Sequence, residues 1–149
     1  MKDPAYTVLV VEDDDDDFLL IRQALESPKS PLVLKRAADG VELFENLQEI
    51  QGGEENDNPT LPGLILLDLN MPKKDGRTAL KELKTSSKWQ RIPVVILTTS
   101  HSQEDIEQCY ELGANTYVTK PVGLDDFISV VRLIRRYWFD AAALPGIDN

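Results

Sequence analysis

The chain lacks a second cysteine and a second histidine, and both absences narrow its chemistry. Cys109 alone cannot form an intramolecular disulfide, and its helical neighbours place it on an apolar face, which favours buried packing over reactivity. His101 stands between Ser100 and Ser102, and no pattern places an acid partner beside it. A histidine-dependent catalytic triad is therefore not expected.

Basic residues are also scarce: 16 Lys and Arg stand against 26 Asp and Glu, which gives a formal net charge of −10. Nucleic acids and anionic membranes bind to basic faces, so we expect neither as a partner. No apolar run approaches the ~20 residues of a membrane span, and the run near the amino terminus is too short for a signal peptide. These features predict a cytoplasmic protein whose partner is another protein.

The length of 149 residues predicts a single domain. Short apolar runs alternate with segments of helical period, which is typical of a doubly wound α/β fold with a parallel sheet. Asp39 is predicted to cap the second helix, and Gly113 to end the fourth in a left-handed conformation. Residues 51–62 have loop composition and are predicted to form a surface insertion without chemistry. The predicted strands are Thr7–Val11, Leu32–Arg36, the run ending at Asp68, Pro93–Leu97 and Asn115–Thr119.

Carboxylates follow the first and third apolar runs: Glu12 and Asp13 come after VLVV, and Asp68 ends LILLD. The carboxyl ends of parallel strands meet at one edge of a sheet, so the three acids should converge there. At about 4 Å, each pair would repel by roughly 4 kcal/mol at an effective dielectric near 20. A divalent cation would relieve this repulsion, and oxygen ligands select Mg2+ or a similar hard ion that also accepts phosphate oxygens. The residues therefore predict a magnesium-assisted phosphoryl site.

The chain contains, in this order, VLVVED, LILLDLNMPKKDG, PVVILTTS, the Gly113-Ala114 pair and YVTKP. Together these motifs resemble the receiver domain of bacterial two-component response regulators. The resemblance implies a (βα)5 flavodoxin-like receiver fold, with a parallel five-stranded sheet of order 2-1-3-4-5 and helices on both faces. It also implies a receiver domain over residues 1–139, a carboxyl-terminal tail over residues 140–149 and no separate output domain.

The same resemblance implies a role for each acid. Asp68 would be the phospho-acceptor, whose carboxylate attacks the phosphorus of a phosphohistidine on a histidine kinase. Asp13 and Asp68 would ligate Mg2+ (or Mn2+) directly, Glu12 largely through water, and Asn70 through its backbone carbonyl. The side chain of Asn70 would also tune the lifetime of the phosphoryl group.

Other residues would respond to the phosphoryl group. The resemblance implies that Lys120 contacts the acyl phosphate, and that Thr98 hydrogen-bonds a phosphoryl oxygen and moves inward. Thr98 would draw the ring of Tyr117 with it, so this pair is the expected switch. Ser100 would tune the phosphoryl lifetime, and the peptide bond between Lys120 and Pro121 would be cis.

The end of the chain carries more apolar surface than one helix needs. One stripe of the helix that begins near Leu124, which includes Leu124 itself, should pack on the sheet. A second stripe and the aromatic residues after it should form an exposed patch of the kind found at protein interfaces. Coverage of this patch by the tail, residues 140–149, is the alternative. The predicted interface residues are Val130, Leu133, Tyr137, Trp138 and Phe139.

The segment RRYWFDAAALPG, with the polar insertion before the third strand, resembles the stand-alone response regulators of cyanobacterial and bacterial phytochrome kinases. This resemblance implies a light-sensing histidine kinase as the partner. It also implies a homodimer formed through the fourth helix, the fifth strand and the fifth helix. The protein would be a switch with weak self-catalysed phosphorylation and dephosphorylation, and not an enzyme.

Alternatives remain open at several positions. Asp14 to Asp17 are interpreted as a solvated helix start, where carboxylates favour the positive end of the dipole. Lys120 alone could be an ordinary surface lysine, and Tyr117 a packed core ring. A magnesium phosphohydrolase is disfavoured because Asn70 stands where such enzymes carry an acid. A phosphorylation-independent pseudo-receiver is disfavoured because the set of acids, threonine and lysine is complete.

Overall fold

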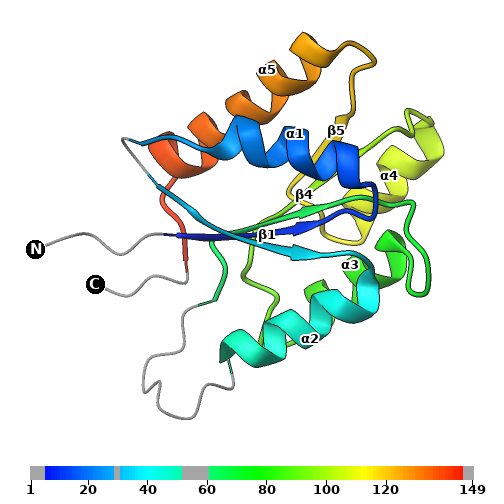
Figure 1. The fold of residues 1–149 in the computed structure, drawn as a ribbon. Helices are drawn as coiled ribbons and strands as arrows, with labels where there is room; N and C mark the ends of the chain where they lie inside the picture. The colour runs from blue at the N-terminus through cyan, green and yellow to red at the C-terminus, as the bar shows by residue number, and fades with distance from the viewer. Residues whose placement is uncertain (1–5, 29–30, 52–60, 146–149) are drawn as a thin grey trace, which may run out of the picture.

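The computed structural model describes residues 6–28, 31–51 and 61–145. They form the predicted doubly wound fold, with a parallel sheet of order β2-β1-β3-β4-β5 (Figure 1). The strands are β1 (Thr7–Val11), β2 (Val33–Ala37), β3 (Leu64–Leu67), β4 (Val94–Thr98) and β5 (Thr116–Thr119). The helices are α1 (Asp15–Leu25), α2 (Gly40–Gln51), α3 (Gly76–Thr85), α4 (Gln103–Glu111) and α5 (Leu124–Arg135), followed by the π-helical turn η1 (Arg136–Ala141).

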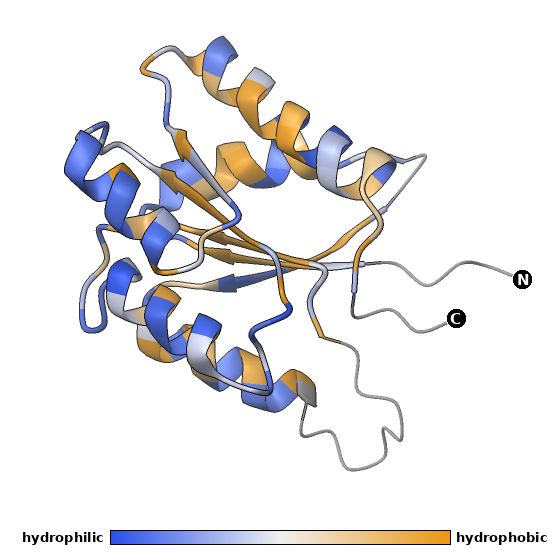
Figure 2. Ribbon diagram, turned by 180° about the vertical axis from the view of Figure 1, so that it is seen from behind, coloured by the Kyte–Doolittle hydropathy of each residue, from blue (hydrophilic) through white to orange (hydrophobic). Residues whose placement is uncertain are grey.

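Helices cover both faces of the sheet, and each face has its own apolar core (Figure 2). One core lies beneath α1 and α5, and the other beneath α2, α3 and α4. Successive side chains of β3 alternate between them: Leu64 and Leu66 join the first core, while Ile65 and Leu67 join the second. All four are buried, which explains why this strand is an uninterrupted aliphatic run.

Both predicted helix ends are confirmed. Asp39 Oδ1 accepts hydrogen bonds from the backbone N–H groups of Val41 and Glu42, each at 2.9 Å, at the start of α2. Gly113 follows α4 with a φ of +106°, a conformation that L side chains rarely adopt. The prediction of an insertion over residues 51–62 falls mostly on residues 52–60, which lie outside the described part of the chain.

A buried arginine ties the carboxyl-terminal end of α5 to the carboxyl-terminal end of α1. Arg135 Nε donates to the carbonyl oxygen of Leu25 at 2.7 Å, and its residue is 6% exposed. Leu124, which was predicted to pack on the sheet, is instead 57% exposed. The prediction was wrong because Leu124 opens the helix, ahead of Phe127, the first of its apolar residues to be buried in the core.

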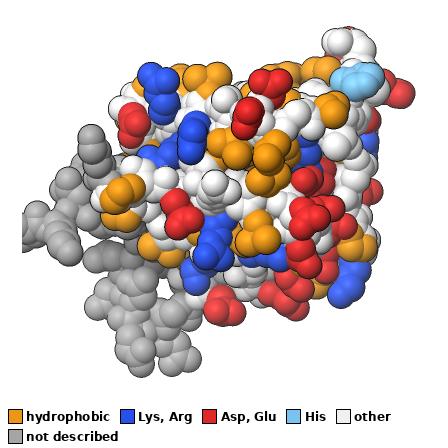
Figure 3. Space-filling model, turned by 45° about the horizontal axis from the view of Figure 1, so that its top comes forward, with side chains coloured by type: hydrophobic (Ala, Val, Ile, Leu, Met, Phe, Trp, Pro, Cys, Tyr) orange, Lys and Arg blue, Asp and Glu red, His pale blue; other side chains and the backbone are white. Residues whose placement is uncertain are grey.

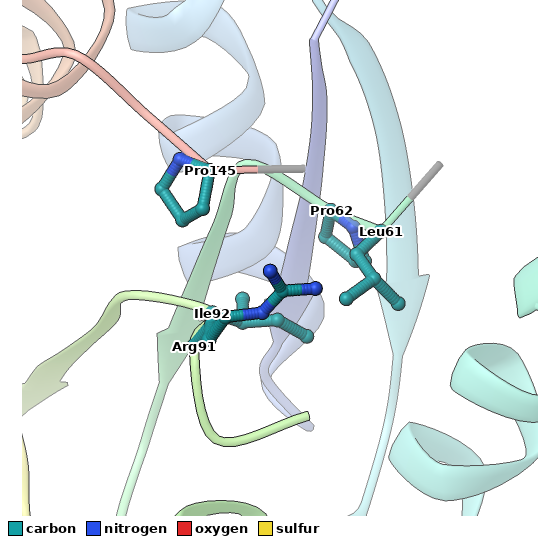
Figure 4. Close-up of a pocket in the computed structure, with 5 residues that line it drawn as sticks. All are labelled: Leu61, Pro62, Arg91, Ile92 and Pro145. Carbon is teal, nitrogen blue, oxygen red and sulfur yellow. The ribbon is translucent and has the colours of Figure 1, made fainter. Parts of the chain in front are cut away.

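The described part of the tail runs to the amino edge of the sheet. Leu144 and Phe139 approach Gly63, just before β3. Pro145 lines a narrow hollow together with residues that lead into β3 and β4 (Figure 4). The exposed surface of α5 and η1 is not covered by these residues, because Leu133 and Tyr137 remain 61% and 57% exposed. Within the described ranges, no helix has both the length and the apolar character needed to span a membrane.

Candidate functional site

The acids that the sequence singles out meet at the carboxyl edge of the sheet. Val11 of β1 pairs with Leu67 of β3, so the residues that follow these strands start from neighbouring positions. Carboxylate oxygens of Glu12, Asp13 and Asp68 lie within 4.8 Å of one another, as predicted. Glu12 and Asp68 are buried, whereas Asp13 is exposed. On the face shown in Figure 3, acidic side chains gather toward this edge.

Backbone hydrogen bonds hold the two buried acids in place. The N–H of Glu12 donates to the carbonyl of Ala37 at 3.0 Å, and the N–H of Asp68 donates to the carbonyl of Val11 at 3.1 Å. The N–H of Asn70 donates to Asp68 Oδ1 at 3.3 Å, while the residue itself is exposed. Asn70 therefore reaches the site through its backbone, and its side chain faces the solvent beside it.

Lys120 lies at the centre of the buried charges. Its Nζ donates to Glu12 Oε1 at 2.7 Å, to Asp17 Oδ2 at 2.8 Å and to Asp68 Oδ2 at 3.4 Å, and its side chain is 4% exposed. The interpretation of Lys120 as an ordinary surface lysine is therefore wrong. Burial opposes the charged form, but the hydrogen bonds that Lys120 donates to Asp17 and Glu12, together with the charge of Asp68, outweigh this effect. Together they hold the pKa of Lys120 above its ordinary value.

Burial shifts the pKa of Glu12 in the opposite direction to that of Lys120. Burial raises the pKa of Glu12 from 4.5 to about 7, although the hydrogen bond and the charge of Lys120 act in the other direction. The backbone N–H of Asp14 also donates to Glu12 Oε2, at 3.1 Å. A carboxylate held in this way lacks solvent to stabilise its charge, so a cation beside it would be strongly favoured.

One acid at the site was missed. Asp14 caps α1 by accepting from the N–H of Asp17 at 2.8 Å, Asp15 pairs with Arg36 at 2.9 Å, and Asp16 is exposed, so the solvated helix start is confirmed for these three. It is wrong for Asp17, whose carboxylate binds Lys120. Asp17 ends a run of five aspartates that begins at Asp13, so residue type gave no signal that distinguishes it from its neighbours.

Thr98 ends β4 on the second-core face, two residues after Ile96. It is fully buried, and no group among the described residues hydrogen-bonds to its hydroxyl. Tyr117 pairs with Ile96 on the neighbouring strand, and its ring packs partly against the same core. The Tyr117 hydroxyl donates to the carbonyl of Ser100 at 2.8 Å. The two predicted switch residues therefore share one face of the sheet, and the loop after β4 links them.

Ser100 belongs to a chain of polar contacts that joins α3 to α4. Its hydroxyl donates to Asp105 Oδ2 at 2.6 Å, and Arg77 binds Asp105 Oδ1 at 2.7 Å. The hydrogen bonds from Ser100 and Arg77 lower the pKa of Asp105. The Ser100 hydroxyl is thus engaged by α4, and sequence patterns gave no sign of this partner.

The peptide bond between Lys120 and Pro121 was predicted to be cis, and this prediction is contradicted. The described residues contain no cis peptide bond. The physical reason is the ordinary one, because even before proline the trans form is favoured by about 0.5–1 kcal/mol. Lys120 is positioned instead by its backbone N–H, which donates to the carbonyl of Thr98 at 2.7 Å.

The five predicted interface residues are not equally available. Leu133 and Tyr137 are mostly exposed, as described above, and Tyr110 of α4 is 48% exposed. Val130, Trp138 and Phe139 are half-buried against the core beneath α1 and α5, so each offers only part of its surface.

The assembled groups suit a hard cation and a phosphate-like anion side by side. The three converging acids offer only oxygen ligands, which Mg2+ and Mn2+ prefer. The Lys120 ammonium and the Thr98 hydroxyl, which has no partner in the described part of the chain, are donors, and donors of this kind bind anionic oxygens. The hollow of Figure 4 has no carboxylate in its lining and lies at the opposite edge of the sheet; the residues that line it are Leu61, Pro62, Arg91, Ile92 and Pro145.

Comparisons with known proteins point the same way. The family model described as response regulator receiver domain matches residues 8–132. Response regulator Rcp1 of Synechocystis sp. (strain PCC 6803) is 41% identical over 144 residues, which cover 97% of this chain and 96% of the relative. The structure of the phosphorylated cyanobacterial phytochrome response regulator RcpA matches with a TM-score of 0.86 and 39% identity, over 95% of this chain and 99% of that one. The Mn2+-bound form of Rcp1 matches with a TM-score of 0.82 and 40% identity, over 94% and 99%.

Proposed function

Because this chain belongs to the family of response regulator receiver domains, we propose that it accepts a phosphoryl group from a histidine kinase on Asp68. One observation carries the proposal: the Lys120 ammonium and the acids Glu12 and Asp13 surround the Asp68 carboxylate. In this proposal residues 1–139 act as one cytoplasmic receiver domain, followed by the tail.

Phosphoryl transfer requires little of the protein beyond positioning the reacting groups and neutralising their charge. An Asp68 oxygen attacks the phosphorus of the phosphohistidine, an acyl phosphate forms, and the bond from phosphorus to the imidazole nitrogen breaks. A divalent cation, Mg2+ or Mn2+, neutralises charge on the phosphoryl oxygens when bound. Asp13, Asp68 and the backbone carbonyl of Asn70 would hold it directly, and Glu12 largely through water. Lys120 supplies a second positive charge at the acyl phosphate.

The phosphoryl group would act through a conformational switch. The Thr98 hydroxyl has no protein partner among the described residues, so a phosphoryl oxygen on Asp68 would give it one. Movement of Thr98 would shift the loop that ends at Ser100, whose carbonyl holds the Tyr117 hydroxyl. Receiver domains are switches rather than true enzymes. Self-catalysed phosphorylation and dephosphorylation would be weak, and Ser100 and Asn70 would tune the lifetime of the phosphoryl group.

The partner we propose is a phytochrome-type kinase, because the similar structure of RcpA is that of a phytochrome response regulator. We further propose a homodimer through α4, β5 and α5, since Tyr110, Leu133 and Tyr137 expose large apolar side chains on this part of the molecule. Sedimentation with Mg2+, with and without beryllofluoride as a phosphoryl mimic, tests the dimer. Truncation after Arg136 should abolish a mass change, and a truncated chain that still dimerises would contradict this surface.

Phosphoryl transfer itself is tested with the variant Asp68→Asn. It keeps the size of the side chain but removes the nucleophilic carboxylate, so it should take no label from a phosphohistidine donor. Asp16→Asn is the matched control, because Asp16 is an exposed acid near the same edge that makes no contact described above. It should be labelled as the wild type is. Equal labelling of Asp68→Asn and the wild type would refute the assignment of Asp68.

A further inference from the structure

Lys120 uses its three N–H donors unequally. An ammonium group has three donors, and here they meet the three carboxylates of Glu12, Asp17 and Asp68. The contacts with Glu12 and Asp17, at 2.7 and 2.8 Å, are short, whereas the contact with Asp68 is 3.4 Å. The two strong bonds therefore draw the ammonium away from the residue that takes the phosphoryl group in the proposed function.

Asp17 differs from the acids around it in the sequence. It lies in the first turn of α1, where its backbone N–H is fixed by the side chain of Asp14. Its side chain is only 29% exposed, and it lines a hollow together with Lys120 and Thr99. Asp17 is not among the three acids that converge as a possible cation site. Its carboxylate thus pairs with Lys120 and is not one of the predicted metal ligands.

From this geometry we propose that Asp17 is a positioning residue that competes with phosphorylated Asp68 for the ammonium of Lys120. The proposal rests on the proposed function and deepens it. When Asp68 carries a phosphoryl group, its new oxygens need a donor, and Asp17 holds one of the three donors of Lys120. The strength of the Asp17 contact then sets how firmly the ammonium holds the phosphoryl group.

The test is the affinity of the full-length protein for beryllofluoride in the presence of Mg2+, measured by titration calorimetry. Asp17→Asn should bind about tenfold more tightly than the wild type, because the loss of a charge-assisted hydrogen bond to a competitor is worth about this much. Asp16→Asn removes the same charge from the neighbouring exposed position. It should change the affinity by less than about twofold, because exposed charges are screened. Asp17→Glu, which keeps a carboxylate on the same helical turn, should return the affinity toward that of the wild type.

A gain in affinity separates this role from a structural one, because damage to the fold would not tighten binding. Urea unfolding of each variant without beryllofluoride measures any structural effect independently. The proposal is overturned if Asp17→Asn binds no more tightly than Asp16→Asn, or more weakly than the wild type. If the wild type and Asp68→Asn give the same titration with beryllofluoride, the proposed function itself fails. If these two differ while Asp17→Asn and Asp16→Asn bind equally, only the role of Asp17 fails.

Discussion

Replacement of Thr98 by valine should change two measurements in opposite directions. The hydroxyl is fully buried and has no hydrogen-bond partner among the described residues. A buried hydroxyl without a partner costs about 1–3 kcal/mol in proteins, and valine has nearly the same shape without this cost. Thr98→Val should therefore raise the free energy of unfolding by about 1–2 kcal/mol. For a chain of this size, the midpoint of thermal unfolding should rise by roughly 2–8 °C.

Binding of the phosphoryl mimic should weaken in the same variant. A hydrogen bond to a charged oxygen contributes about 1.5–3 kcal/mol, so loss of the Thr98 hydroxyl should reduce the affinity for beryllofluoride by roughly 10- to 100-fold. Urea unfolding measures the change in stability, provided that the dependence of the unfolding free energy on urea concentration keeps its slope. Titration calorimetry measures the change in affinity for beryllofluoride. Thr119→Val is the control, because the Thr119 hydroxyl already has a partner, the carbonyl of Ser100 at 3.5 Å, and its removal should give no such gain in stability. A less stable Thr98→Val, or one that binds the mimic as tightly as the wild type, would refute the reasoning.

Three further experiments test the surroundings of the site and the packing of α4. A Cβ at Gly76 would overlap the carbonyl oxygen of Asp68, so Gly76→Ala should lower the free energy of unfolding by about 1–3 kcal/mol in urea. Gly123→Ser, whose Cβ meets no described atom closer than 3.6 Å, should instead gain a few tenths of a kcal/mol as a helix cap, and equal effects of the two changes would contradict this account. The Cys109 thiol is fully buried and burial raises its pKa, so a thiol reagent should label it only after denaturant is added; rapid labelling of the native protein would show that α4 opens readily.

The parts of the fold that depend on the pattern of apolar and polar residues along the chain were predictable. β3 is an aliphatic run because both of its faces are buried, and the position of Asp68 at its end follows directly. Convergence with Glu12 also follows, since parallel strands in register bring their ends together. The caps at Asp39 and Gly113 were readable because each residue type satisfies one local backbone requirement.

Features set by side-chain choice in three dimensions were not predictable. Asp17 sits in a run of five aspartates, and only the packed structure selects it as the partner of Lys120. Arg135 reads as a surface charge, yet it is buried because its guanidinium reaches a carbonyl of α1. The π-helical turn η1 was not predicted, because its residues, RYWFDA, include no proline or glycine that would mark a break in the helix. The predicted cis bond before Pro121 came from resemblance alone, which local chemistry did not support.

The division of the apolar interior into two cores places one indole in each half of the molecule. Trp89 packs against Phe44, with ring centroids 5.4 Å apart, in the core that also receives Ile96 and Tyr117. Trp138 meets Tyr137 edge-on at 5.1 Å and belongs with the core beneath α1 and α5. The two tryptophans are therefore intrinsic fluorescent probes, one for each side of the sheet. A signal that travels through Thr98 and Tyr117 should alter the emission of Trp89, while a rearrangement of α5 should alter that of Trp138.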